Sequence, residues 1–112
     1  MNSQLTIQMV TWNSADDLKE SLPVLASFPS EEITFLVIDN GSADESVSLV
    51  KKLLPSAEVI ELSKNHGFAG AHNIGFAQNE TELVMVCNPD LLPSWRGIQE
   101  TLQAFEDEKV GS

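Results

Sequence analysis

Three short apolar runs of this chain each end in polar residues that could bind a nucleotide or a metal ion. The apolar runs cover residues 5–10, 33–38 and 83–87, and the polar segments that follow are Thr11-Trp12-Asn13-Ser14, Asp39-Asn40-Gly41-Ser42 and Asn88-Pro89-Asp90. Apolar runs of this length that stop at turn residues are typical of buried parallel strands. Ligands of open parallel sheets bind beyond the carboxyl ends of the strands. The three polar segments therefore predict one shared crevice.

Asp90 is the candidate metal ligand of this crevice. Mg²⁺ and Mn²⁺ prefer carboxylate oxygens and commonly bridge a protein to a diphosphate group. A single carboxylate suits a metal ion whose other positions are taken by phosphates and water. The alternative interpretation is a plain Asn-Pro turn without a ligand.

Asp39 is the second candidate because it directly follows the apolar residues 35–38, which would place its carboxylate at the mouth of the crevice. The functional interpretation is a hydrogen-bond acceptor for a nucleotide base. The alternative is a turn or cap in which the carboxylate organises the three residues after it. The two roles are compatible.

Other kinds of catalytic site find little support. His66 and His72 are six residues apart, which is not the spacing of a helical zinc pair, so we interpret them as polar loop or crevice residues. Cys87 lies inside an apolar run, and we expect a buried thiol that is not a nucleophile. We find no complete catalytic constellation in the sequence.

The elements that position these residues follow from the hydrophobic pattern. Two helices begin with capping-box spacing, Ser14 with Asp17 and Ser42 with Glu45. Pro23 lies inside the first helical pattern and predicts a kink or two short helices. Strands that alternate with helices of this length indicate a parallel sheet.

A short third strand over residues 57–62 precedes a segment rich in glycine and asparagine, residues 63–76, where a third helix should start. Repeated glycine there suggests close approach of another backbone or of a ligand. Its last two glycines have the spacing of a P-loop, but Phe76 and Ala77 replace the Lys and the Ser or Thr of that motif. A last helix is predicted by the apolar spacing of Trp95, Ile98, Leu102 and Phe105.

Length and composition indicate a single soluble domain over residues 1–112. Hydrophobic residues make up 42% of the chain and charged residues 21%, which is ordinary for a globular protein. No apolar run is long enough to cross a bilayer, and the first residues carry no basic region of a secretory signal. We expect a cytoplasmic location, either free or peripheral to the inner membrane.

The charge balance limits the class of partner. Six Lys and Arg residues stand against seventeen Asp and Glu residues, which gives a formal net charge of -11. Such a chain repels polyanions, so nucleic acid is not expected as a partner. Only Lys64 lies near a predicted strand end, so an anionic ligand in the crevice would need a metal cation beside it.

Taken together, four motifs resemble those of the inverting nucleotide-sugar glycosyltransferases, in particular the rhamnosyltransferase-like branch. The motifs are Val10-Thr11-Trp12-Asn13-Ser14, Val37-Ile38-Asp39-Asn40-Gly41-Ser42, Asn65-His66-Gly67-Phe68-Ala69-Gly70 with Asn73 and Gly75, and Asn88-Pro89-Asp90. They occur in the order found in that family, and each stands at a predicted strand end. Any one motif is weak, but four in register over residues 5–106 are specific.

The resemblance implies the α/β, Rossmann-like donor-binding half of a GT-A fold. Its mainly parallel sheet would have about four strands in the order 3-2-1-4, with helices on both faces. The substrate would be a dTDP-linked or UDP-linked sugar for cell-envelope polysaccharide synthesis, with an unknown saccharide acceptor. Matching positions imply that Asp90 holds Mg²⁺ or Mn²⁺ and that the nucleotide is bound by Thr11, Trp12, Asn13, Asp39, Asn40, Asn65, Gly67, Asn73 and Asn88.

The chain also departs from the family, because the catalytic base and acceptor site belong to the family's C-terminal half. We therefore expect a donor-binding domain that is inactive or feeble alone. The alternative is a non-catalytic interaction module derived from the same fold. A phosphotransfer receiver that uses Asp39 is disfavoured, because further acidic residues after strand one and a lysine near the last strand are missing. The uncovered edge of strand four predicts self-association.

Overall fold

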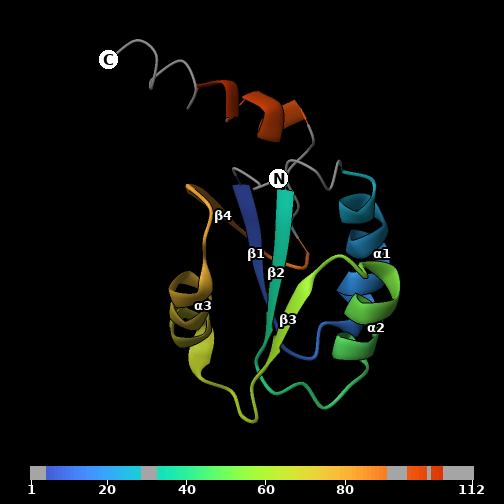
Figure 1. Cartoon of the computed structure of the whole chain (residues 1–112). Helices are drawn as coiled ribbons and strands as arrows, with labels where there is room; N and C mark the ends of the chain where they lie inside the picture. Colours follow the sequence, from blue (N-terminus) through green and yellow to red (C-terminus); the bar gives the residue numbers. More distant parts are fainter. Residues whose placement is uncertain (1–4, 29–32, 91–95, 101, 105–112) are drawn as a thin grey trace.

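The computed structural model describes residues 5–28, 33–90, 96–100 and 102–104. Strands and helices alternate along the chain (Figure 1). They are β1 (Leu5–Thr11), α1 (Ala15–Ala26), β2 (Ile33–Asp39), α2 (Ser46–Leu53), β3 (Glu58–Glu61), α3 (Gly67–Gln78) and β4 (Leu83–Cys87). All three strand pairings are parallel, and the strand order is β3-β2-β1-β4. The predicted sheet and its order are confirmed.

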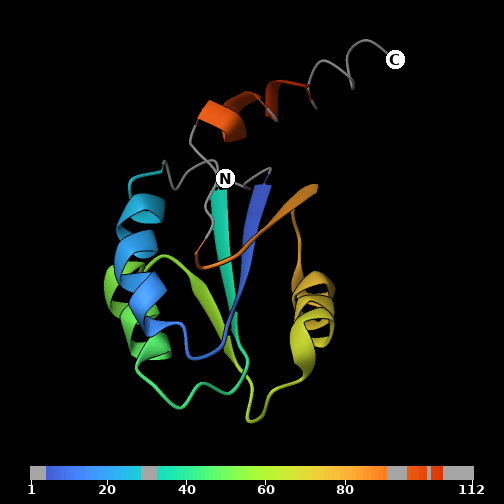
Figure 2. The same ribbon diagram turned by 180° about the vertical axis from the view of Figure 1, so that it is seen from behind.

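Helices cover both faces of the sheet, as predicted. Helices α1 and α2 lie on one face and α3 on the other (Figures 1 and 2). Successive strand side chains point to opposite faces, so Ile7 and Met9 of β1 join the larger core below α1 and α2. On the α3 side, Leu36 and Ile38 of β2 pack with Ala71 in a smaller cluster.

Gly70 and Gly75 of α3 lie in different environments. A Cβ atom at Gly75 would lie 2.6 Å from the side-chain Cδ of Gln8 and 2.7 Å from Cδ1 of Ile38. A Cβ atom at Gly70 would meet only Cβ of His66, at the ordinary distance of 3.4 Å. Close approach of the helix to two side chains of the sheet therefore explains Gly75, so the neighbour at this position is not the backbone or ligand that the sequence suggests.

His72 is a core residue, which corrects its interpretation as a loop or crevice histidine. It belongs to α3 and is only 4% exposed, and Nε2 of Gln8 donates to its Nδ1 at 2.8 Å and to its backbone oxygen at 3.1 Å. Phe68 and Phe76 flank the imidazole ring. Burial lowers the pKa of His72, so the neutral ring with its proton on Nε2 is the form that fits this bond.

Both predicted capping boxes are wrong. Ser14 is the N-cap residue of α1, but its hydroxyl donates to the carbonyl of Trp12, and α2 begins only at Ser46. Instead, the Ala15 amide donates to Oδ2 of Asp44, while the Ser46 hydroxyl and amide donate to Oδ1. The Ser46 hydroxyl bond is the main reason that the pKa of Asp44 is lowered. One carboxylate thus serves the first turns of two neighbouring helices.

Several smaller expectations can also be assessed. Helix α1 runs through Pro23 as one helix, so the alternative of two short helices is wrong. Cys87 is buried as expected, and burial raises the pKa of its thiol to about 12.

Ile98 of the last helical segment is fully buried, whereas Trp95 and Phe105 lie outside the described residues. Within the described part of the chain, no helix has the length and apolar character needed to span a membrane.

Gly70 and Gly75 of α3 allow a matched stability test. We expect Gly75→Ala to lower the free energy of unfolding by about 1–3 kcal/mol, because the new methyl group overpacks the contact with the sheet. Gly70→Ala should raise it by about 0.5–1 kcal/mol, because alanine favours the helix and the space is free. Urea denaturation of both variants measures the difference, and equal effects would contradict the close approach at Gly75.

Candidate functional site

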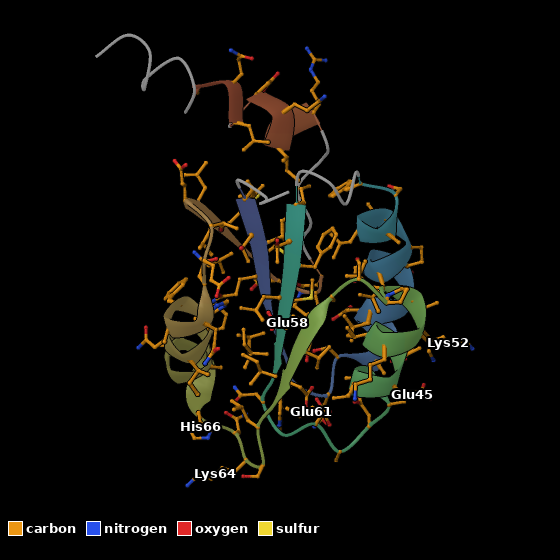
Figure 3. The ribbon with its side chains drawn as sticks, in the orientation of Figure 1. Glu45, Lys52, Glu58, Glu61, Lys64 and His66 are labelled. Atoms are coloured by element: carbon orange, nitrogen blue, oxygen red, sulfur yellow. The ribbon has the colours of Figure 1, made fainter. Side chains whose placement is uncertain are left out.

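An open hollow of about 330 Å³ lies at the carboxyl ends of the central strands. Figure 3 shows Lys64 and His66 at the same end of the molecule, on the segment that joins β3 to α3. Four separate parts of the chain contribute to the hollow. Its lining residues are Val10, Trp12, Ser14, Asp17, Asn40, Asn65, Phe68, Asn88, Pro89 and Asp90. The polar segments after β1, β2 and β4 thus share one crevice, as their spacing predicts.

Two aromatic side chains in this lining remain largely open to solvent. Trp12, directly after β1, is 53% exposed, and Phe68, in the first turn of α3, is 59% exposed. Large exposed aromatic rings in a hollow are typical of ligand sites, because they offer flat apolar faces at low entropic cost. Asn40, at the end of β2, lies in the same lining but is almost completely buried.

The charge of the hollow is negative. Asp17 of α1 and Asp90 after β4 are its ionisable lining residues, and none of the described residues that line it is Lys, Arg or His. The described part of the chain also contains no group of three or more His, Cys, Asp or Glu residues arranged to hold a metal ion. A protein-only metal cage is therefore absent from that part, whereas one or two carboxylates can hold a cation that a ligand's phosphates also coordinate.

Asp39 points to the other side of the sheet and lines a neighbouring hollow of about 490 Å³. Its Oδ1 accepts hydrogen bonds from the hydroxyls of Thr11, at 2.7 Å, and Ser42, at 2.6 Å, and its Oδ2 accepts from the Ser42 amide at 2.9 Å. The turn that was the alternative interpretation of Asp39 is therefore formed.

Asn13 and Thr11 also use their side chains for contacts within the protein. Asn13 adopts the left-handed backbone conformation, with φ of 47°, which asparagine tolerates better than most residues. Its Oδ1 accepts a hydrogen bond from the Ala43 amide at 2.7 Å, and its own amide donates to the Ser42 hydroxyl. These bonds tie the loop after β1 to the loop after β2.

Two further predicted residues, Gly67 and Asn73, lie on α3. Gly67 begins the helix with φ of 79°, and its amide donates to Oδ1 of Asn65 at 2.6 Å. Asn73 is exposed on α3 and is not part of the lining of the 330 Å³ hollow. Among the predicted site residues, those that line this hollow are Trp12, Asn40, Asn65, Asn88 and Asp90.

Sequence reasoning missed Phe68 and Asp17 as parts of the hollow. Phe68 stands inside the Asn65-His66-Gly67-Phe68 motif, so its position beside Gly67 was the available signal. Asp17 was interpreted as a helix cap, and its place one turn after the polar segment that ends in Ser14 was the signal for a crevice residue.

Comparison with known proteins shows the family of this chain. Residues 6–112 match the model of glycosyl transferase family 2. The chain belongs to that family. Staphylococcus aureus poly-beta-1,6-N-acetyl-D-glucosamine synthase is 24% identical over 111 residues, a match that includes 96% of this chain and 27% of the relative.

Solved structures share the fold. TarS 1-349 of S. aureus superposes with a TM-score of 0.82 at 28% identity, over 94% of this chain and 32% of that one. The same protein in complex with UDP-GlcNAc gives 0.83 at 27% identity, covering 94% of this chain and 31% of that one. The mannosyltransferase PcManGT from Pyrobaculum calidifontis, in complex with GDP-Man and Mn²⁺, gives 0.79 at 22% identity, over 91% and 32%. The family 2 chain described here thus spans about a third or less of these proteins.

The Asp39 hydrogen bonds predict a stability effect that needs no ligand. We expect Asp39→Ala to lower the free energy of unfolding by about 1–3 kcal/mol, because the fully buried Thr11 hydroxyl loses its acceptor. The control Asp16→Ala removes an exposed carboxylate of α1 and should change it by less than about 0.5 kcal/mol. Chemical denaturation compares the two, and an unchanged stability of the Asp39 variant would refute the bracing role.

Proposed function

We propose that this chain is the donor-binding part of a glycosyltransferase and that it binds a nucleoside-diphosphate sugar in the 330 Å³ hollow. The observation that carries the proposal is the convergence of Trp12, Asn40, Phe68 and Asp90 from four parts of the chain on one crevice. Family membership adds the chemical class of substrate. The nucleoside would lie against the aromatic residues, and the diphosphate would extend toward Asp90.

The relatives support a uridine nucleotide as the first ligand to try. TarS has been solved with UDP and with UDP-GlcNAc, at 28% and 27% identity to this chain. The S. aureus relative is a poly-beta-1,6-N-acetyl-D-glucosamine synthase. We propose a UDP-linked or dTDP-linked sugar as the donor and a saccharide hydroxyl as the acceptor.

The residues present fit a divalent cation shared with the substrate. Asp90 is exposed in the hollow, Asp17 lies in the same lining, and no cationic side chain among the described lining residues could balance a diphosphate. Mg²⁺ or Mn²⁺ would supply Lewis-acid stabilisation of the negative charge on the leaving diphosphate. Asp90 would hold the cation, and PcManGT, which shares the fold, was solved with GDP-Man and Mn²⁺.

The chain's own contribution is binding and orientation of the donor. Asn88 and Pro89 fix where β4 ends and so where the Asp90 carboxylate lies relative to Trp12. Transfer also needs a base that removes the proton from the acceptor hydroxyl. The family resemblance assigns that base to the family's C-terminal half, so we propose that this chain assayed alone binds the donor but transfers little or no sugar.

Calorimetric titration with UDP and dTDP, with and without Mn²⁺, tests the proposed site. We expect saturable binding that requires Mn²⁺ and that Asp90→Ala abolishes, because the variant removes the carboxylate nearest the expected diphosphate. Asp39→Ala should bind more weakly, because Thr11 at the end of β1 loses the hydrogen bond that it donates to the carboxylate.

Asp16→Ala is the matched control for this titration, because it removes an exposed carboxylate one residue from Asp17 without touching the hollow lining. It should bind UDP like the unchanged protein. Binding that does not require the metal, or no binding of UDP, dTDP, CDP and GDP, would instead support the non-catalytic interaction module.

We further propose that the free edge of β4 pairs with a second copy of the chain. In the described residues β4 pairs with β1 alone, and Val86 of this strand is 43% exposed. Edge strands with exposed apolar side chains are sites of association. Light scattering over a concentration series should show dimers, and Val86→Lys should shift them to monomers. A monomer at every concentration would overturn this proposal.

A further inference from the structure

Asn40 occupies a junction between the two sides of the hollow. Its backbone amide donates to the carbonyl of Thr11 at 2.8 Å, which extends the pairing of β1 with β2 by one residue. Its side chain points the other way and bonds to the backbone at the start of α3. Oδ1 accepts from the His66 amide at 2.8 Å, and Nδ2 donates to the carbonyl of Gly67 at 3.1 Å.

The orientation of the Asn40 carboxamide is determined by these partners. A backbone amide can only donate and a backbone carbonyl can only accept, so the oxygen must face His66 and the nitrogen must face Gly67. Aspartate has the same shape but no donor in its ionised form. A carboxylate at this position would face the carbonyl oxygen of Gly67 with negative charge and would lose that bond.

Two further contacts hold the same segment against the end of β2. The Leu62 amide donates to the carbonyl of Asp39 at 2.9 Å. At Gly41, whose φ is 81°, a Cβ atom would lie 3.0 Å from the backbone carbon of Lys64. The residues around Asn40 thus leave little freedom to the chain that leads into α3, and the Asn40 side chain completes this attachment at the helix start.

We infer that Asn40 is a positioning residue that sets the spacing between the two aromatic sides of the hollow. Through its backbone it is fixed to the end of β1, next to Trp12, and through its side chain it holds the turn that precedes Phe68. Both ends of the carboxamide are occupied, so its effect on a nucleotide is exerted through the geometry of the site. This inference rests on the proposed function for its effect on binding, but not for its effect on the free protein.

Two substitutions separate the donor from the acceptor of the Asn40 side chain. Asn40→Asp keeps an acceptor for His66 and removes the donor to Gly67, whereas Asn40→Ala removes both. At about pH 8 we expect Asn40→Asp to bind UDP with Mn²⁺ about tenfold more weakly, the factor that corresponds to one lost hydrogen bond. Burial beside the Gly67 carbonyl should raise the pKa of the new carboxyl group above its ordinary value of about 3.9. At about pH 5 part of it is then protonated and can donate to Gly67, so affinity should return part of the way toward that of the unchanged protein.

Asn40→Ala should bind weakly at both pH values, because it has no group to protonate. The unchanged protein must be titrated at each pH as well, because other ionisable groups surround the hollow: Lys64 and His66 on the segment before α3, Asp17 on α1, Asp39 at the end of β2 and Asp90 after β4. Gln78→Glu, which makes the same amide-to-acid change at the exposed end of α3, should match the unchanged protein.

Hydrogen exchange of the ligand-free protein provides the independent readout. The His66 amide should exchange faster in Asn40→Ala, because it loses its acceptor, while amides of the β1 and β2 strands keep their protection. If the unchanged protein binds no nucleotide, the proposed function fails and this exchange experiment still tests the attachment. The inference is overturned if Asn40→Asp binds UDP as tightly at about pH 8 as the unchanged protein, if it alters the preference for UDP over CDP, or if His66 exchange is unaffected in Asn40→Ala.

Discussion

The parallel pairing of β1 with β2 and β4 is the constraint on which the rest of the structure depends. β1 and β2 pair in register over their whole length, so Thr11 lies directly opposite Asp39, and β4 ends at Cys87, opposite Met9 near the same end of β1. The polar segments after these strands therefore lie at one end of the sheet because the strands pair, and no direct contact between the segments is needed to bring them together. The crevice is a consequence of strand pairing, and the polar residues only determine what it can bind.

The two sides of the sheet differ at the carboxyl ends of the strands. On the α1 and α2 side, Asp39 accepts hydrogen bonds from Thr11 and Ser42, and Asp44 serves the first turns of both helices. On the other side, the aromatic rings and Asp90 remain exposed around the hollow. Buried and partly buried hydrogen bonds on the α1 and α2 side hold the loops, which leaves the exposed side chains around the hollow free for a ligand.

The negative charge of the chain is consistent with this division. A net charge of -11 and a hollow whose described lining carries only carboxylates as charged groups are poorly suited to hold a diphosphate directly. A divalent cation bound between them would remove that conflict, because the carboxylates of the hollow and the diphosphate would both be attracted to the same ion. Composition and site geometry thus favour the cation-assisted binding proposed above.

The sequence alone predicts the strands and, through the family resemblance, their order. It also predicts five residues that line the hollow: Trp12, Asn40, Asn65, Asn88 and Asp90. The strands follow from apolar runs that stop at turn residues, which is a local signal, whereas the order and the nucleotide-site residues follow from the resemblance. The side of the sheet to which Asp39 and Asn40 point is visible only in the tertiary structure. Adjacent strand residues face opposite sides, and the sequence pattern does not show which of the two faces α2 and which faces α3. The tertiary structure also shows that His72 is a core residue bonded to Gln8. It shows that Asp44, and not the predicted capping residues, accepts a hydrogen bond from the first turn of α1. Those partners are 64 and 29 residues apart in sequence, and such distances become contacts only when the sheet has formed.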